Sequence, residues 1–533
     1  MTIWDTRSEY DSRAYEWRLA RAMLGGTPAM RGESPSATSV QLSAIGASGS
    51  SEWLPRMPSD SDQSYWMRWD RAYFFGAFSD TVSRIAAKQF AEPINVDGGS
   101  DLTEQIVSDA DRAGTTLHQL AHVHSATKLA FGSAGIIVAM PGTSSLPADA
   151  LDPAGRVHEA GRSRFKVRPF LRRVHPMNVQ QWAFEDDADG VRRLVYLVIR
   201  CDGEERDGEG KWATIKRAKV YEIGEGGIAT VQDVREGAGA DGQMTVVAGE
   251  PMSLGVPWIP FVCDMALLPG DDQDESEMTA RSPLADLMWI NYQHFRETAE
   301  QGVALLFARS EAPVEMGCAP ADEAKRLDWG LGKAKRTSTP PDQYRIQFVG
   351  PSGKGVELGA ASLADIESRM VRMMARPMQR TSGQVTATGA VMDESGSESA
   401  AEAMSRGTEQ ALMTALRMAE AMATGQAEYS ALLPDLTVDI VADFAFGIGD
   451  SVAKGTFLQG LYDGGLLTKR HILGELKSLK LLSEETDVDA LIAELDEDAD
   501  VALERQVAAM DRMAARPPKP IQGEADVSQD GAA

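Results

Sequence analysis

Three histidines lie close together in the pattern HxxxHxH. His118 and His122 are four residues apart in a segment with helical spacing, so they share a face, as a pair of zinc ligands does. His124 points elsewhere, and no glutamate occupies the place that the general base has in HExxH. Two interpretations stay open: a metal-dependent hydrolase that uses His118 and His122, and ordinary, partly buried histidines. The pattern favours the second.

Two glycine-bearing stretches, GLGK at 330–333 and GPSGKG at 350–355, have the composition of phosphate-binding loops. Neither matches GxxxxGK followed by Ser or Thr, and neither clearly joins a strand to a helix. The sequence also lacks a GxSxG elbow and a catalytic cysteine signature. Carboxylates are too numerous for one pair to be chosen as acid and base. We therefore expect that the chain is not an enzyme and that it has no catalytic residues, no cofactor and no metal site.

Composition narrows the class of protein. The chain has 533 residues, too many for one ordinary core, and 43% of them are hydrophobic. No apolar run is long enough to span a membrane, and three widely spaced cysteines fit a reduced, cytosolic folding environment. The net charge is -26, the opposite of what a protein needs to grip phosphates. Such acidity serves solubility, or an acidic surface that DNA can pass without sticking.

The N-terminal half predicts helices followed by strands. An aromatic-rich helix is expected over 64–90, a second helical stretch over 101–131 and a buried strand over 135–141. A β-hairpin is expected from 194–200 and 212–223, which flank a polar, glycine-bearing run. This order indicates an α+β fold.

A long helix over 282–309 opens the C-terminal half, with Ser282 as N-cap and Pro283 at its first position. Gly- and Pro-rich pieces follow, then a second helix. The sixteen small and polar residues TSGQVTATGAVMDESG at 381–396 precede a long Ala- and Met-rich helix. A strand is expected over 436–446, then short helices, and the last residues lack the apolar side chains needed to fold.

In this order the elements resemble the tailed-bacteriophage portal proteins, or head-to-tail connectors. The stretches that carry the resemblance together cover most of residues 55–500. They are RWDRAYFFGAFSDTVSRIAAKQFAEP, DADRAGTTLHQLAHVHSATKLAFGSAGIIVAMPG, RPFLRRVHPMNVQQWAFE with VPWIPFV, SPLADLMWINYQHFRETAEQG, and YDGGLLTKRHILGELKSLKLLSEETDVDALIAELDED.

The resemblance implies a ring, typically a dodecamer, at one capsid vertex of a virion assembled in the bacterial cytoplasm. Double-stranded DNA would be packaged and ejected through it without sequence-specific binding. The implied partners are the terminase large subunit, head–tail adaptor proteins and the major capsid protein, with no membrane. The implied regions are 1–281 (N-terminal segment and wing), 282–309 (first stem helix), 310–358 (clip), 359–379 (second stem helix), 380–396 (tunnel loop), 397–446 (wing helix and strand), 447–515 (crown) and 516–533 (disordered tail).

The same resemblance suggests two sets of contact residues. Lys333, Lys335 and Arg336 are expected to meet partners at the clip, although a small solvated basic cluster is the simpler interpretation. The DNA-facing residues of the tunnel loop would be Thr381, Ser382, Gln384, Thr386, Thr388, Gly389 and Met392. An ordinary exposed loop remains the alternative for these seven. For the whole chain, the alternative is another virion assembly protein, such as a capsid or scaffold protein.

Overall fold

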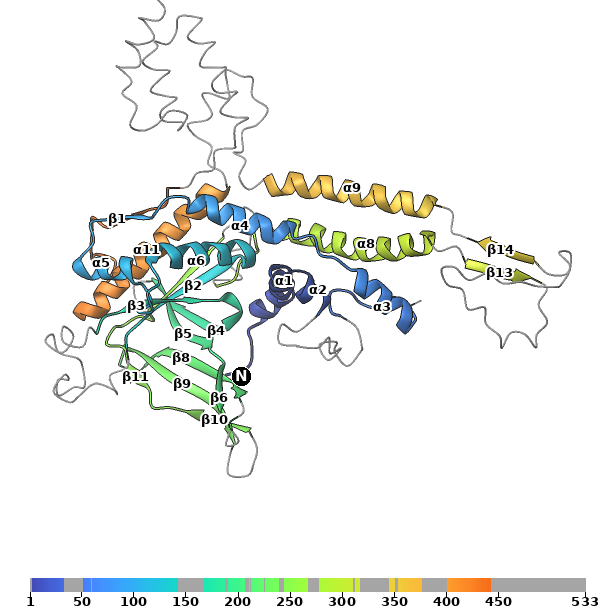
Figure 1. Ribbon diagram of the computed structural model, residues 1–533. Helices are drawn as coiled ribbons and strands as arrows, with labels where there is room; N and C mark the ends of the chain where they lie inside the picture. Colours follow the sequence, from blue (N-terminus) through green and yellow to red (C-terminus); the bar gives the residue numbers. More distant parts are fainter. Residues whose placement is uncertain are drawn as a thin grey trace, which may run out of the picture. The chain divides into compact units, whose positions relative to one another are not determined.

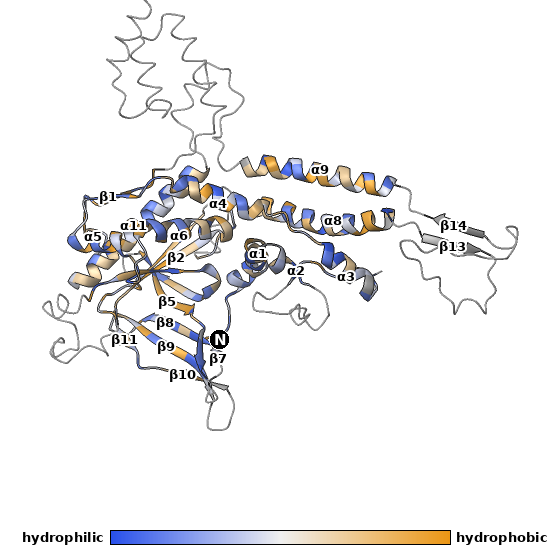
Figure 2. Ribbon diagram, in the orientation of Figure 1, coloured by the Kyte–Doolittle hydropathy of each residue, from blue (hydrophilic) through white to orange (hydrophobic). Residues whose placement is uncertain are grey.

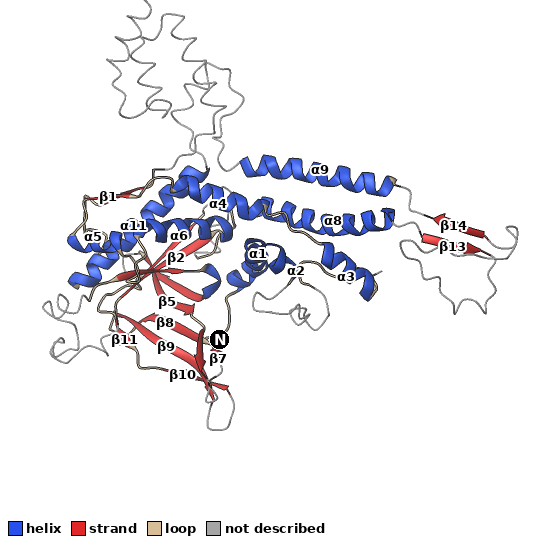
Figure 3. Cartoon of the chain, in the orientation of Figure 1, coloured by secondary structure: helices blue, strands red, loops and turns tan. Residues whose placement is uncertain are grey.

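The computed structural model divides the chain into two units, Met1–Phe444 and Ala445–Ala533. All described residues lie in the first unit: 2–32, 51–58, 60–141, 167–186, 190–206, 210, 212–224, 226–238, 244–266, 278–309, 312–316, 345–349, 353–375 and 400–441. The expected crown (447–515) and tail (516–533) therefore lie outside them. Helices and strands are both abundant, which confirms the α+β class (Figure 3).

In Figure 1 most of the helices lie together on one side of the large sheet, and α6 (Leu117–Phe131) and α11 (Ala400–Thr424) contact the three-stranded sheet. Among the described residues, no helix is long and apolar enough to cross a membrane. The helices are α1 (Ser8–Leu24), α2 (Gly26–Arg31), α3 (Asp62–Arg71), α4 (Ala77–Gln89), α5 (Asp101–Ser108), α6 (Leu117–Phe131), α8 (Ala285–Arg309), α9 (Lys354–Ala375), α11 (Ala400–Thr424) and the 3₁₀ turn η3 (Pro176–Asn178).

All the described strand pairs are antiparallel, in five sheets. The largest has the order β10-β9-β8-β5-β4, with β11 also paired to β9, and a three-stranded sheet has the order β12-β2-β3. The pairs β1–β15, β13–β14 and β6–β7 complete the set. The strands are β1 (Asn95–Asp97), β2 (Ser133–Ala139), β3 (Phe170–Val174), β4 (Val179–Asp186), β5 (Arg192–Arg200), β6 (Gly203–Arg206), β7 (Trp212–Ile215), β8 (Arg217–Ile223), β9 (Ala229–Ala238), β10 (Met244–Ala248), β11 (Met252–Ser253), β12 (Phe261–Met265), β13 (Ala312–Met316), β14 (Arg345–Val349) and β15 (Thr437–Asp439).

The expected hairpin is confirmed, because β5 pairs with β8 and places Leu197 opposite Tyr221. Part of the polar run between them is also a strand, since β6 lies in that run and pairs with β7, the first four residues of the segment expected as the second strand. The outer edge of this sheet is covered by the N-terminal segment, whose Arg7 backbone N–H donates to the Gln180 carbonyl at 3.2 Å. One face of the sheet packs on the three-stranded sheet, and Ile3 and Trp4 cover part of the other.

The three-stranded sheet lies at the centre of the wing, the name used below for residues 2–281 together with α11 and β15. Its middle strand, β2, is buried along nearly its whole length, as expected for the apolar segment at 135–141. α6 and α11 both contact this sheet. Gly135 is required there, because a Cβ would lie 2.6 Å from the ring of Phe261 on the neighbouring strand.

The prediction of one continuous helix over 64–90 is wrong, because the segment is divided into α3 and α4. The side-chain amide of Asn291 donates to the Phe75 carbonyl at 2.7 Å and accepts the Phe78 N–H at 3.0 Å, which stabilises the break. The aromatic residues are consequently divided. Phe74 and Phe78 are buried, whereas Tyr73 is 62% exposed.

The helical stretch expected over 101–131 is also two helices. Asp111 accepts the backbone N–H groups of Ala113 and Thr115, and Arg112 has a φ of 64°, so the chain turns tightly between α5 and α6. Thr116 then begins α6 with a complete capping box to Gln119.

Three further boundaries differ from expectation. α8 begins at Ala285, because Ser282 uses its hydroxyl in a preceding turn, where it accepts the Leu284 N–H at 3.1 Å and donates to the Leu129 carbonyl. α9 begins at Lys354, five residues before the expected stem helix and inside the segment assigned to the clip. The strand expected over 436–446 is described only as the three residues of β15.

Candidate functional site

α8 and α9 form an antiparallel helical pair (Figure 1). The contacts run in opposite directions along the two helices. His294 Nε2 lies 3.2 Å from Glu367, the Ser362 hydroxyl donates to Glu297 at 2.7 Å, and the Gln301 amide donates to the Val356 carbonyl at 2.8 Å. Apolar contacts between Leu287 on α8 and Ile366 and Met370 on α9 complete the pair near its base.

The pair is buried at one end and exposed at the other. The N-terminal half of α8 enters the main core with Met288, Tyr292 and Phe295, but beyond Ala299 none of its described side chains is buried. In α9 only Ile366 and Met370 are buried among the described side chains, and Leu358 is 73% exposed. Apolar and polar positions alternate along both helices (Figure 2). The pair therefore extends from the core.

The far ends of the two helices are joined through a β-hairpin. β13 begins three residues after α8 ends, and β14 ends five residues before α9 begins. The strands pair from Ala312 opposite Val349 to Met316 opposite Arg345. The basic residues of the expected clip contact, Lys333, Lys335 and Arg336, lie outside the described residues.

The expected tunnel loop also lies outside the described residues, which stop at Ala375 in α9 and resume at Ala400 in α11. The structure therefore does not place any of the seven residues predicted to face DNA, namely Thr381, Ser382, Gln384, Thr386, Thr388, Gly389 and Met392. What it shows is how the chain is anchored on both sides of this segment.

On the downstream side, α11 is held by a buried charge cluster. Lys128 on α6 donates to Asp264 on β12 at 2.5 Å and to the Met404 carbonyl on α11 at 3.0 Å. The Thr408 hydroxyl donates to the second oxygen of Asp264 at 2.9 Å, and His124 Nε2 lies 3.1 Å from the same oxygen. The side chains of Lys128, Asp264, Thr408 and His124 are almost fully buried. The cluster joins α6, β12 and α11 in the interior of the wing.

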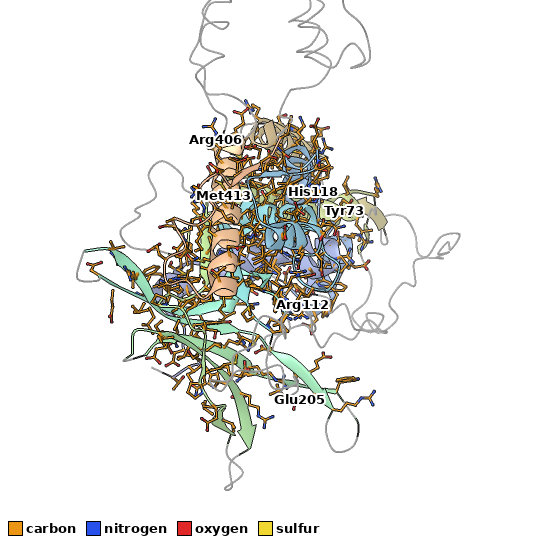
Figure 4. The ribbon with its side chains drawn as sticks, turned by 90° about the vertical axis from the view of Figure 1, so that its left-hand side faces the viewer. Tyr73, Arg112, His118, Glu205, Arg406 and Met413 are labelled. Carbon is orange, nitrogen blue, oxygen red and sulfur yellow. The ribbon has the colours of Figure 1, made fainter. Side chains whose placement is uncertain are left out.

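The electrostatics of the cluster favour ionised Asp264. Burial by itself would raise the pKa of this carboxyl, but the hydrogen bond from His124 and the positive charge of Lys128 outweigh burial and hold the pKa below its usual value. The carboxylate accepts from three donors, so its charge is compensated. Gly407 makes room for the ammonium, because a Cβ there would lie 2.8 Å from Lys128 Nζ. Figure 4 looks onto α11, with Arg406 and Met413 labelled along it.

The histidines of the HxxxHxH pattern do not form a common site. His118 and His122 lie on one side of α6 against the ring of Phe90, with centroid distances of 5.7 and 5.5 Å. His124 faces the charge cluster instead. Among the described residues, no three His, Cys, Asp or Glu side chains are grouped to hold a metal ion. Within the described part of the chain, no third ligand lies beside His118 and His122.

Sequence reasoning singled out His124 but missed the residues that it meets. Lys128 lies in the same helical segment, four residues later, among apolar neighbours. Asp264 interrupts an apolar strand, and Gly407 interrupts a helix otherwise rich in Ala and Met. These three interruptions were the available signal, since a charge or a glycine inside an apolar element needs a partner or a close contact.

Comparison with known proteins gives a partial family match and structural likenesses of low identity, two of which follow. Residues 283–423, from the start of α8 to the end of α11, match a family described as a domain of unknown function (DUF4055). No curated protein sequence matches the chain. The chain is similar to a chain of the structure "Virion of native gene transfer agent (GTA) particle", at 12% identity over 79% of this chain and 94% of that chain, with a TM-score of 0.36. It is also similar to a chain of "Neck of empty GTA particle computed with C6 symmetry", at 13% identity over 82% and 98%, with a TM-score of 0.36.

Proposed function

We propose that this chain is a phage portal protein, the subunit of a ring through which double-stranded DNA enters and leaves a capsid. The observation that carries the proposal is the course of the chain from α8 to α11. It leaves the core along one helix, forms a hairpin, returns along a second helix and then re-enters the core through α11. This is the sequence of stem, clip, stem, tunnel loop and wing helix that the resemblance implies. The proposal depends on this course of the chain and on the resemblance in sequence.

In this proposal the residues act mechanically and not as an enzyme. The α8–α9 pair is the stem, and β13–β14 belongs to the clip, where Lys333, Lys335 and Arg336 meet the terminase large subunit or adaptor proteins. The segment between α9 and α11 is the tunnel loop. The wing contacts neighbouring subunits and the major capsid protein within the virion.

The negative net charge of the chain favours a ring through which DNA passes over one that binds DNA tightly. Each subunit carries a net charge of -26, so a ring of any size is strongly acidic. A basic channel would hold DNA by releasing counterions from its phosphates, whereas an acidic wall repels the phosphates and lets the duplex move. A ring also needs two different complementary faces on every subunit, because its contacts are heterologous.

The decisive experiment is the mass and symmetry of the purified chain. Twelve copies of 57.5 kDa give about 690 kDa, which mass photometry separates from a monomer, and negative-stain images would show a ring with a central hole. Shells or rods would favour a capsid or scaffold protein. A chain that remains monomeric both alone and with a terminase or capsid partner would contradict the proposal.

A further inference from the structure

Four of the five exposed aromatic side chains in the described part of the chain lie beside α8, in two patches. The first patch is Tyr15 and Trp289, which are 40% and 38% exposed and whose rings stack at a centroid distance of 5.9 Å. The second patch is Tyr73 and Phe75, which are 62% and 49% exposed and lie between α3 and α4. The fifth side chain, Trp212, is on β7. Exposed apolar side chains that are grouped and not scattered mark interaction surfaces.

The two patches lie on nearly opposite sides of α8. The Phe75 ring contacts that of His294 at a centroid distance of 5.8 Å, and the Phe75 carbonyl accepts from the Asn291 side chain. Successive residues of an α-helix are separated by about 100° around its axis. Trp289 is therefore about 140° from His294 and about 160° from Asn291. A copy of the chain bound at one patch leaves the other patch open to a further copy.

The first patch has one positive charge that no ion pair compensates. Arg18 pairs with Glu52 at 3.1 Å. Arg296 lies over the Tyr292 ring, 5.8 Å from its centroid, and forms no ion pair with a described residue. Glu300 follows one turn farther along α8, away from the patch. The guanidinium of Arg296 is therefore the charge that this patch offers to a partner.

The second patch has one exposed negative charge beside it. The side chain of Glu367 on α9 is 59% exposed and lies 3.2 Å from His294, whose ring contacts the patch. Asp70 and Arg71 precede the patch in the chain and compensate each other at 4.0 Å. The carboxylate of Glu367 is opposite in sign to the guanidinium of Arg296. The two patches are consequently complementary in charge, which favours their contact and disfavours contact of either patch with itself.

We propose that the two patches bind each other between successive copies of this chain, so that Tyr15 and Trp289 of one copy pack on Tyr73 and Phe75 of the next. The inference rests on the proposed function and deepens it, because it names the two different faces that a ring requires. Aromatic side chains and arginine dominate the affinity of many protein interfaces, and they are what the first patch contains. Because the patches face away from each other, the contact adds copy after copy and does not stop at a dimer.

The test blocks one patch at a time and then mixes the two blocked chains. W289E puts a carboxylate in the first patch, where it meets Glu367 of the next copy, and Y73R puts a guanidinium in the second patch, where it meets Arg296. Each variant alone should lose every species larger than the monomer. An equimolar mixture should form a dimer of about 115 kDa, twice 57.5 kDa, and nothing larger, because each chain keeps one unaltered patch. Mass photometry separates these species.

The matched control is W212E on β7, where the same charge replaces a tryptophan that is 63% exposed and far from both patches in the fold. It should assemble as the unaltered chain does, and a monomeric W212E would count against the proposal, because any added charge would then suffice. Two monomeric variants that do not pair in the mixture would overturn the proposal, since the patches would then not bind each other.

Failure of this interface and failure of the proposed function give different results. Rings formed by W289E and Y73R would overturn the interface and leave the portal function standing. An open filament formed by the unaltered chain, together with a dimer in the mixture, would support the interface and contradict a closed ring. An unaltered chain that stays monomeric would contradict the interface, whereas the portal function is then decided with a terminase or capsid partner.

Cysteine cross-linking decides the case if a blocked chain does not fold, because it leaves both patches nearly intact. Serine first replaces Cys201, Cys263 and Cys318. With a short bismaleimide, the chain W289C/Y73C should give a ladder of cross-linked multimers, whereas W289C or Y73C alone should give none. Cross-linked dimers of either single variant, or no ladder from the double variant, would refute the contact between the two patches.

Discussion

Replacing Gly407 by alanine tests how tightly the charge cluster is held. In an ordinary helix interior this change is stabilising by about 1 kcal/mol, because alanine has the higher helix propensity. Here the new methyl would lie 2.8 Å from Lys128 Nζ, so the ammonium must shift within the buried cluster, where it donates to Asp264 and the Met404 carbonyl. Breaking a buried pair completely costs about 3 kcal/mol, which is the upper limit for this shift. A loss of up to about 3 less a gain of about 1 predicts a net destabilisation of up to about 2 kcal/mol.

The assay is hydrogen exchange of the peptides that cover α11 and β12. A chain with two structural units does not unfold in one transition, so a single melting temperature would not localise the effect. Local opening made easier by up to about 2 kcal/mol raises the exchange rate by up to about 30-fold in these peptides.

The matched control is Gly355→Ala in α9, where a Cβ meets no atom within 4 Å. Exchange in α9 should be unchanged or slower in that variant, because only helix propensity is altered. Unchanged or slower exchange of α11 in Gly407→Ala would refute the reasoning, since it would mean that the ammonium does not occupy the space above Gly407.

Three other changes test the wing and the proposed loop. Thr408→Val should destabilise the wing by about 1–3 kcal/mol, because it removes a donor from buried Asp264, whereas Thr408→Ser should not; denaturation followed by exchange in α11 measures both. Burial and the charges of Arg21 and Arg173 lower the pKa of His175 from 6.5 to about 4. As the pH drops from 6.5 to 4, the unfolded chain therefore binds a proton at this histidine before the folded chain does. The free energy of unfolding should fall over this range by at most about 3 kcal/mol. His175→Asn keeps the acceptor for the Met177 N–H and should abolish this pH dependence; an equal dependence in the variant would assign it to other groups. Deletion of 384–394 should leave ring assembly intact but impair DNA packaging or retention, and normal packaging would refute the tunnel-loop assignment.

Helix existence could be predicted from periodicity, but helix ends could not. The apolar spacing over 64–90 is continuous, so nothing local indicates that the helix stops after Arg71. The break depends on Asn291, more than 200 residues later, which binds the backbone on both sides of Gly76. At α9 the opposite occurred. Gly355 suggested a loop, yet the helix includes it, because one face of α9 packs on α8.

The candidate site was predictable only where neighbours in sequence are neighbours in space. His118 and His122 do share a face of α6, as their spacing indicates, but the sequence does not show that the face meets Phe90. Lys128 and Asp264 are 136 residues apart, and Thr408 is 144 residues beyond Asp264. Only the fold brings them together. Without the fold, a buried lysine in an apolar helix is indistinguishable from one whose amine reaches solvent.

The segment from α8 to α11 is attached to the core differently at its two ends, and this difference bears on its function. At the upstream end, α8 enters the core through Met288, Tyr292 and Phe295, whose sizes and shapes define one fit. At the downstream end, α11 buries mainly alanine and methionine, and a buried ion pair also contacts it. A well-packed apolar contact would generally be at least as stable as such a pair, so stability alone does not explain the lysine and the aspartate. Because Lys128 donates to the Met404 carbonyl and Thr408 donates to Asp264, the pair holds this turn of α11 at a defined place beside α6 and β12. A segment that projects from the wing and returns to it needs such a defined point of return.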